Sequence, residues 1–235
     1  MEELAERLAV IPGVIAVTLG GSRARSEALP DSDWDFGLYY RGAIDVDAVR
    51  ALGYEGVVVE PGAWGRLVNG GAWLAIDGQR VDLLYRDLDV VEYWQAEAEN
   101  GRFEVDQVPS FLAGMATYVL VAELVLAKTL VGSLPRPDFP GPLRASASDY
   151  WQRIADFTLS LGSRLAKRGD RATAIGTLLQ AALATAQARL ATRGEWVLNE
   201  KRILGRAGLH EAAAAFDSLE DLETTAARLA EALAP

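Results

Sequence analysis

The glycine and serine residues at positions 20 to 22 could bind phosphate. Gly20-Gly21-Ser22 follows the apolar, β-branched segment from Val14 to Leu19. Two glycines let the backbone turn sharply and present its N–H groups, and Ser22 adds a hydroxyl. Phosphate oxygens fit such a turn. By itself the tripeptide is weak evidence for phosphate binding, because ordinary strand-to-helix turns use the same residues.

Two aspartates, Asp33 and Asp35, follow Ser22 after ten intervening residues. They stand at the start of a predicted strand from Trp34 to Tyr40, whose alternation points both carboxylates to one face. Their Cα atoms would be roughly 6.6 Å apart, a span that two carboxylates bridge with one or two divalent ions. The alternative is that the acidic cluster beginning at Asp31 forms a solvated turn.

A third carboxylate, Asp82, lies in an otherwise apolar segment that ends at Tyr85. A single acid in a strand is costly unless solvent, a partner or a metal compensates its charge. A neighbouring strand could place Asp82 beside the aspartate pair. The alternative is an ion pair with Arg80 or Arg86. The coincidence of turn, aspartate pair and third acid favours a metal-binding triad.

The spacing of these residues resembles that of a known superfamily. Gly21-Ser22, ten residues, Asp33-x-Asp35 and then Asp82 on a later strand resemble the polymerase-beta-like nucleotidyltransferases. The layout is similar to that of the kanamycin and lincosamide nucleotidyltransferases and of the minimal nucleotidyltransferase antitoxins. Two further segments resemble uncharacterised bacterial nucleotidyltransferase-domain proteins, namely Gly114 to Leu130 and Trp196 to Arg202.

The resemblance implies a metal-dependent transfer of a nucleoside monophosphate. Asp33 and Asp35 would bind two Mg²⁺ ions, with Mn²⁺ as an alternative, while Asp82 would ligate the metal and could accept the acceptor's proton. We expect AMP from ATP to pass to a hydroxyl of a small molecule, such as an aminoglycoside-like or lincosamide-like antibiotic. The alternatives are AMPylation of a partner protein and a non-catalytic nucleotide-binding module. A monomer or a homodimer fits equally well.

The triphosphate needs hydrogen-bond donors and positive charge near the triad. The candidate nucleotide-binding residues are Gly20, Gly21, Ser22, Arg23, Arg25, Lys128 and Lys201. The arginines and Lys201 could equally be surface residues, and Lys128 could extend its charge to solvent from a helix. A group of aromatic residues could stack on a base, line the acceptor site or pack in the core, namely Trp64, Trp73, Tyr85, Tyr93 and Trp94.

Composition narrows the range of metals and substrates. The 235 residues include no cysteine and one histidine, so a metal would be held by oxygen, which favours Mg²⁺ or Mn²⁺. The net charge of −10 argues against a long nucleic acid as substrate. Residues 1 to 107 carry −11, whereas residues 108 to 235 carry +1.

The amino terminus is charged and lacks the features of a secretory signal, so we expect a cytoplasmic protein. The apolar run from Phe111 to Val131 approaches membrane-spanning length, but Glu123 and Lys128 interrupt it. We interpret the run as a single helix buried in protein, with no membrane contact.

The elements that must position the triad indicate an α+β fold. Residues 1 to 107 are predicted to form a small mixed-sheet catalytic domain with flanking helices, and residues 108 to 235 a helical bundle. The predicted strands are Val14 to Leu19, Trp34 to Tyr40, Ala72 to Ile76 and Arg80 to Tyr85, the last two joined by Asp77-Gly78. The predicted helices are Met1 to Ile11, Ser22 to Ala28, Ile44 to Leu52, Val90 to Glu99, Phe111 to Val131, Ser148 to Lys167, Arg171 to Thr192 and Glu211 to Leu233. The proline-rich segment from Gly132 to Ala147 is predicted to be an extended connection.

Overall fold

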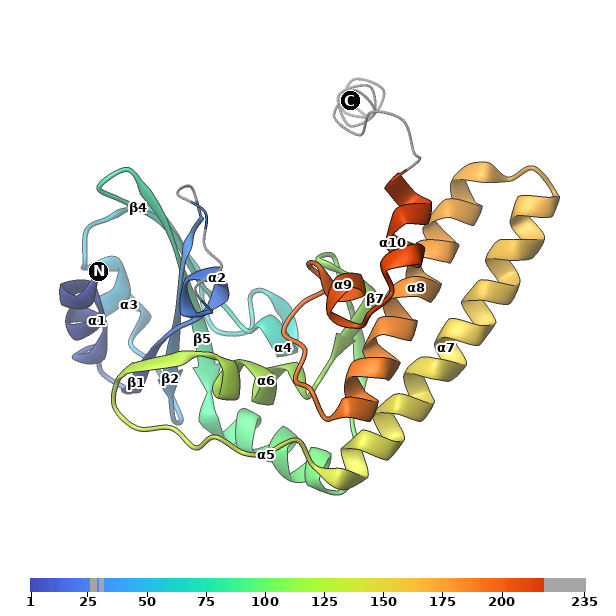
Figure 1. Cartoon of the computed structure of the whole chain (residues 1–235). Coiled ribbons are helices and arrows are strands. Elements are labelled where there is room, and N and C mark those ends of the chain that lie inside the picture. Colours follow the sequence, from blue (N-terminus) through green and yellow to red (C-terminus); the bar gives the residue numbers. More distant parts are fainter. Residues whose placement is uncertain (26–28, 30–31, 218–235) are drawn as a thin grey trace.

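A computed structural model describes residues 1–25, 29 and 32–217. Within them the chain forms a mixed α+β fold in which a six-stranded sheet stands beside a long helical hairpin (Figure 1). The strands are β1 Val14–Leu19, β2 Trp34–Tyr40, β3 Glu55–Val58, β4 Gly71–Ile76, β5 Gln79–Asp87, β6 Val105–Val108, β7 Phe111–Ala116 and β8 Lys128–Val131. The helices are α1 Glu2–Ala9, α2 Gly21–Ala24, α3 Val46–Arg50, α4 Gly65–Val68, α5 Leu88–Glu99, α6 Val119–Leu126, α7 Gly141–Lys167, α8 Arg171–Arg193, α9 Ile203–Arg206 and α10 His210–Asp217.

The strands of the large sheet follow the order β3-β4-β5-β2-β1-β8. Strands β2 and β5 pair in parallel, and the other neighbouring pairs are antiparallel. The predicted strands β1 and β2 are confirmed with their bounds, and β4 and β5 form the predicted hairpin. At its turn Asp77 and Gly78 have φ values of 50° and 75°, which is the backbone that a tight two-residue hairpin requires.

The two faces of the sheet have different environments. One face packs its large side chains, such as Phe36, Leu38 and Leu83, against α1 and α3, and these three are fully buried. On the other face Tyr39 contacts a second apolar cluster that includes α5 and α6. Asp35 and Asp82 lie on this second face, beyond the part that the helices cover, and are only partly buried. The alternation of the strands thus keeps the acids away from the main core.

The prediction of one helix from Phe111 to Val131 is wrong. This run forms β7, then α6, then β8, and β8 pairs with β1 at the edge of the large sheet. Gly114 explains part of the difference, because its φ of 108° is left-handed and a Cβ there would lie 2.5 Å from Val105 of β6. Periodicity cannot distinguish a helix from strands in a run that is buried on several sides.

The structure also revises other boundaries. Helix α7 begins at Gly141, so the end of the predicted extended connection is helical, with Pro142 in the first turn where its missing N–H costs nothing. Strand β3, helix α4 and the β6–β7 hairpin were not predicted. The predicted helices Ser22 to Ala28 and Glu211 to Leu233 are observed as α2 and α10, and residues 26–28 and 218–233 lie outside the described part.

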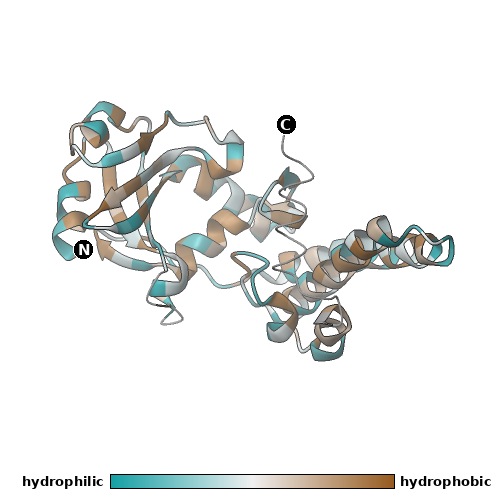
Figure 2. Ribbon diagram, turned by 90° about the horizontal axis from the view of Figure 1, so that it is seen from above, coloured by the Kyte–Doolittle hydropathy of each residue, from teal (hydrophilic) through white to brown (hydrophobic). Residues whose placement is uncertain are grey.

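The carboxyl-terminal half is dominated by the antiparallel pair α7 and α8. Asp170 caps α8 by accepting a hydrogen bond from the N–H of Thr173, and Trp151 of α7 is fully buried, its indole donating to Tyr118 at 2.7 Å. Seen from above, the hairpin extends away from the sheet and has a hydrophilic far end (Figure 2). Among the described helices none has both the length and the hydropathy to cross a bilayer.

The predicted division at residue 107 stays a prediction. Strand β8, from beyond that point, completes the large sheet, and Glu200 accepts hydrogen bonds from the N–H groups of Leu112 and Ala113 in β7. The carboxyl-terminal half therefore contributes directly to the surroundings of the carboxylates.

Candidate active site

Asp35 and Asp82 lie side by side on neighbouring strands. They are direct partners in the parallel register of β2 and β5, so both side chains point to the same face of the sheet. The glycine turn is next to them, because the N–H of Gly20 donates to the carbonyl of Asp35 at 2.7 Å. A Cβ on Gly21 would lie 1.7 Å from Oδ2 of Asp35, and Gly21 has a φ of 60°. Only glycine lets the turn approach the carboxylate this closely.

Asp33 precedes β2 and is held by two arginines. The guanidinium of Arg23 donates to the carbonyls of Ser32 and Asp33 and stacks on the ring of Trp34, with its central carbon 4.2 Å from the ring centroid. The Nε of Arg80 forms an ion pair with Oδ1 of Asp33 at 2.6 Å, but the two groups are not oriented for a hydrogen bond. This buried oxygen therefore accepts no hydrogen bond from the described residues. Arg23 thus positions the backbone of Asp33, and its contact with a nucleotide stays a prediction.

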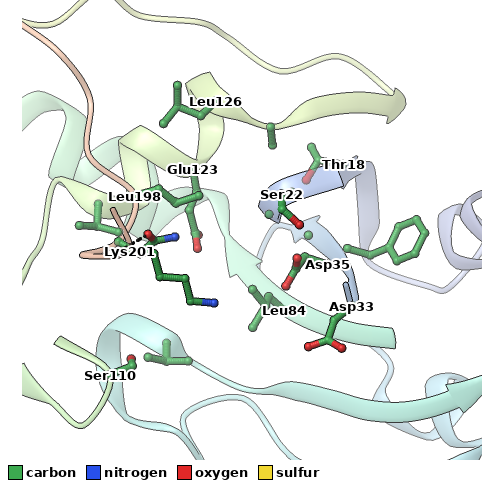
Figure 3. A pocket seen from close by; sticks show the side chains of 18 of the residues that line it. Thr18, Ser22, Asp33, Asp35, Leu84, Ser110, Glu123, Leu126, Leu198 and Lys201 are labelled. Atoms are coloured by element: carbon green, nitrogen blue, oxygen red, sulfur yellow. Dashed lines mark hydrogen bonds between the residues drawn. The ribbon is translucent and has the colours of Figure 1, made fainter. Parts of the chain in front are cut away.

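A cavity of about 740 Å³ opens beside the turn and the carboxylates. Of the predicted site residues, it is lined by Gly20, Gly21, Ser22, Arg25, Asp33, Asp35 and Lys201. Figure 3 shows Lys201 extending from the opposite side of the cavity toward the two aspartates. The positive charge of Lys201 lowers the pKa of Asp35, although other causes outweigh it. The lining does not include three other predicted site residues, Arg23, Asp82 and the exposed Lys128 at the start of β8, although Asp82 is the register partner of Asp35.

Sequence reasoning missed the opposite wall of the cavity. Glu123 of α6 forms a bidentate ion pair with Arg86 of β5, whose side chain is 4% exposed. Arg86 also donates to the carbonyl of Val68 at 2.8 Å. Glu200 binds the backbone of β7 and so fixes the segment that carries Lys201. The isolated acid in the apolar run was a sequence signal for Glu123, and Glu200 lies in the segment from Trp196 to Arg202 that resembles other nucleotidyltransferase-domain proteins, although that resemblance assigned it no role.

The carboxylates at the site are poorly compensated. Burial, followed by repulsion from Asp35 and Asp33, raises the pKa of Asp82 to about 6. Burial, followed by the charge of Asp33, also raises the pKa of Asp35 above its ordinary value. The predicted alternative for Asp82 was an ion pair with Arg80 or Arg86, but in the described part of the chain Arg80 pairs with Asp33 and Arg86 pairs with Glu123. The cluster therefore has an excess of negative charge that a cation would relieve.

The chemical type of the three acidic side chains suits a divalent cation, but their present positions do not. All three acids supply oxygen, two are in direct register, and one has a buried oxygen without a donor. Among the described residues, however, no three acidic or histidine side chains converge closely enough to hold one ion as they stand. Because aspartate rotates about two side-chain bonds, binding of a cation would require these carboxylates to reorient.

The raised pKa of Asp82 predicts pH-dependent stabilisation by metal. Mg²⁺ at several times its Kd is expected to stabilise the fold by about 1 kcal/mol at pH 7.5, or ~2–4 °C in Tm. The effect should largely disappear at pH 5, because below its pKa of about 6 Asp82 is protonated and protons compete with the cation. Thermal scans with MgCl₂, or with NaCl of equal ionic strength plus EDTA, measure the difference. Equal shifts at both pH values would contradict a carboxylate site.

The amino-terminal part of the chain matches a known domain family. Residues 1–104 match the nucleotidyltransferase domain family. This part of the chain is a nucleotidyltransferase domain of the polymerase-beta-like superfamily, and nucleotidyl transfer is the class of reaction that the family supports. A solved structure of a nucleotidyltransferase-like protein from Exiguobacterium sibiricum is similar over 95% of this chain and 68% of its own, with 13% identity and a TM-score of 0.41. No curated protein matches the sequence.

Proposed function

We propose that the protein transfers a nucleoside monophosphate, AMP from ATP, to a hydroxyl of a small molecule. One observation carries the proposal: Asp35 and Asp82 are in direct register beside the glycine turn, with Asp33 on the same strand end. A triphosphate at the turn would have its α-phosphate next to these carboxylates. Nucleotidyl transfer needs this combination of a phosphate-binding turn and clustered acids.

Binding of the triphosphate would use the turn and the cations that face it. The backbone N–H groups around Gly21 and the hydroxyl of Ser22 would donate to phosphate oxygens. Arg25 and Lys201 both line the cavity and both lower the pKa of Asp35, so their charges lie near the proposed phosphate position. Mg²⁺, held by Asp33, Asp35 and Asp82, would supply the positive charge that stabilises the attacking and leaving oxygens.

The transfer itself is a substitution at the α-phosphorus. The acceptor's hydroxyl oxygen forms a bond to this phosphorus while the bond to the bridging oxygen of the β-phosphate breaks. Pyrophosphate leaves with the bonding electron pair, and Asp82 takes the hydroxyl proton and passes it to solvent. The role of the protein is mainly to orient both substrates for this displacement.

The acceptor in this proposal is small. A cavity of about 740 Å³ accommodates a nucleotide and part of a second small molecule, and the net charge of −10 disfavours a long polyanion. The resemblance to the kanamycin and lincosamide nucleotidyltransferases suggests an antibiotic-like hydroxyl compound as the acceptor.

The proposal is tested by incubating the protein with ATP, Mg²⁺ and a panel of hydroxyl compounds. We expect pyrophosphate release that depends on both metal and acceptor, together with an acceptor whose mass increases by one AMP residue. Parallel reactions with GTP, CTP and UTP test the nucleobase. If the protein bound ATP tightly but transferred AMP to no small-molecule or protein acceptor, the proposal would be wrong and the protein would be a non-catalytic nucleotide-binding module. Transfer to a protein alone would indicate AMPylation.

Loss of the charge on Lys201 is expected to weaken nucleotide binding. Lys201→Met should raise the Kd for a non-hydrolysable ATP analogue about tenfold, because a charge-assisted contact to phosphate is worth roughly 1.4 kcal/mol. Isothermal titration calorimetry with Mg²⁺ present measures the change. Lys167→Met, at the exposed end of α7, is the matched control and should leave the Kd unchanged. Equal affinities of the two variants would remove Lys201 from the site.

A further inference from the structure

A row of directly paired residues crosses the open face of the large sheet. Val57 pairs with Trp73, Trp73 with Asp82, and Asp82 with Asp35. Residues paired in this way point to the same face, and their Cβ atoms lie about 4.5–5.5 Å apart. Trp73 is therefore an immediate neighbour of the carboxylate that we propose to take the acceptor's proton.

Trp73 exposes a large aromatic surface at this place. The residue is 53% exposed, whereas its neighbours Ala72 and Leu74 are buried on the opposite face of the strand. Trp64 stacks on it with ring centroids 4.6 Å apart and planes inclined by 22°. The two rings, which we call the tryptophan shelf, leave much of Trp73 in contact with water. Such apolar exposure beside a reaction centre suggests a binding surface.

The shelf is held in position before any ligand binds. The ring of Trp64 lies over Gly71, where a Cβ would be only 3.0 Å from it. Asn69 adopts a left-handed φ of 68°, accepts a hydrogen bond from the N–H of Gly62 at 2.8 Å and donates to Tyr40 at 3.0 Å. These contacts fix the loop that carries Trp64, so a ligand would not have to order it.

The position of the shelf identifies which substrate it faces. The glycine turn contacts Asp35 from the β1 side, whereas Trp73 lies on the β4 side of Asp82, so turn and shelf are on opposite sides of the two aspartates. In an in-line displacement the attacking and leaving oxygens are on opposite sides of the phosphorus. If pyrophosphate leaves at the turn, the attacking hydroxyl must approach from the side of the shelf.

We propose that Trp73, supported by Trp64, forms the acceptor subsite, and that the acceptor is a ring compound with a positive charge near its reactive hydroxyl. The inference rests on the proposed function and adds the acceptor's place and chemical class. An indole ring offers a flat surface to the face of another ring and attracts a cation. The adjacent carboxylate of Asp82 and the charge of −11 on residues 1 to 107 add to that attraction.

The test uses two six-membered ring probes of similar size and different charge. In the ¹⁵N-labelled full chain with Mg²⁺ and a non-hydrolysable ATP analogue, 2-deoxystreptamine, a diamine, and neutral myo-inositol are titrated while indole N–H signals are recorded. The Trp73 signal is assigned from its loss in Trp73→Phe. We expect this signal to shift with the diamine at a Kd at least tenfold lower than that for myo-inositol.

Variants separate the shelf from a merely structural tryptophan. Trp73→Ala should weaken diamine binding about tenfold and leave ATP-analogue binding unchanged, while Trp73→Phe, which keeps an aromatic face, should stay within about threefold. Tyr93→Ala, which removes a ring of similar exposure (57%) on α5, should change neither.

Equal binding of the two probes, or full diamine affinity in Trp73→Ala, would overturn the shelf as acceptor subsite. Loss of ATP-analogue binding in that variant would assign the shelf to the nucleobase instead and so would also overturn it. A wild-type chain that fails to bind the ATP analogue would refute the proposed function, whereas analogue binding without diamine binding refutes the shelf alone.

Discussion

Asp82→Asn is expected to lower kcat for nucleotidyl transfer about a thousandfold or more while raising Tm. Asparagine has nearly the same shape but carries no charge, so it neither holds a divalent cation well nor accepts the hydroxyl proton. Losses of this size are typical when a group that acts on the developing transition state is removed.

The expected rise in Tm follows from the pKa of the same residue. Because the folded-state pKa of Asp82, about 6, is above the ordinary value of 3.8, the folded state binds this proton more tightly than the unfolded state. Stability from this group is present below about pH 4 and is lost as the pH rises through 6, so the ionised carboxylate destabilises the metal-free fold at pH 7. Allowing for its partial exposure, removal of the charge should stabilise by about 1 kcal/mol, or ~2–4 °C.

Two measurements on the same preparation decide this prediction. Pyrophosphate release in the presence of Mg²⁺ and the identified acceptor gives kcat, and calorimetry in EDTA at pH 7.5 gives Tm. Asp77→Asn is the control, because Asp77 is an exposed acid at the turn of the same hairpin and asparagine tolerates its left-handed φ of 50°. Activity within twofold of wild type would refute the assignment of Asp82. A fall in both activity and Tm would show a structural role.

Glu123→Ala is expected to destabilise the fold by about 3–5 kcal/mol. The side chain of Arg86 is 4% exposed and that of Glu123 is 19% exposed, so the variant would leave a guanidinium buried without its counter-charge. The carbonyl oxygens of Val68 and Tyr85 would still accept hydrogen bonds from Arg86, but they do not neutralise it. This pair joins β5 to α6, and so links the strand of Asp82 to the wall of the cavity.

Urea denaturation of the metal-free chain measures this effect. The double variant Arg86→Met, Glu123→Leu should recover most of the loss, because replacing both partners by apolar residues removes the unpaired charge. As a control, Asp149→Ala breaks an exposed ion pair with Arg153 on α7 and should cost less than about 0.5 kcal/mol. If Glu123→Ala lowered the free energy of unfolding by as little as Asp149→Ala, Arg86 would have to reach solvent in the variant. The ion pair would then not stabilise the contact between β5 and α6.

Local sequence was sufficient to predict four strands of the large sheet, namely β1, β2, β4 and β5. Strands β1 and β2 have the predicted bounds because each is an apolar, β-branched or aromatic segment with clear turn residues beside it. The Asp77-Gly78 dipeptide predicted the β4–β5 hairpin correctly, whereas the shared face of Asp33 and Asp35 stays a prediction because β2 begins only at Trp34. These properties depend on neighbours within a few residues, so a single sequence contains them.

Tertiary structure alone decided how distant segments combine. The run from Phe111 to Val131 is apolar almost throughout, so its local pattern could not choose between a helix and strands. Free edges of β1 and β6 decided it, since pairing there satisfies backbone groups that would otherwise be left unpaired. The ion pair of Glu123 with Arg86 likewise joins segments that are distant in the sequence, so local sequence could not predict it.

The candidate site also has a part that the sequence predicted and a part that only the tertiary structure revealed. Sequence spacing predicted Gly20 to Ser22, the aspartate pair and Asp82 as site residues, because their types and order resemble the superfamily motif, and this assignment stays a prediction. Only the fold placed Lys201 across the cavity from Asp35 and Trp73 beside Asp82. The reason is physical: strand register and the attachment of Glu200, next to Lys201, to the backbone of Leu112 and Ala113 depend on hydrogen bonds between segments far apart in sequence, which no local pattern records.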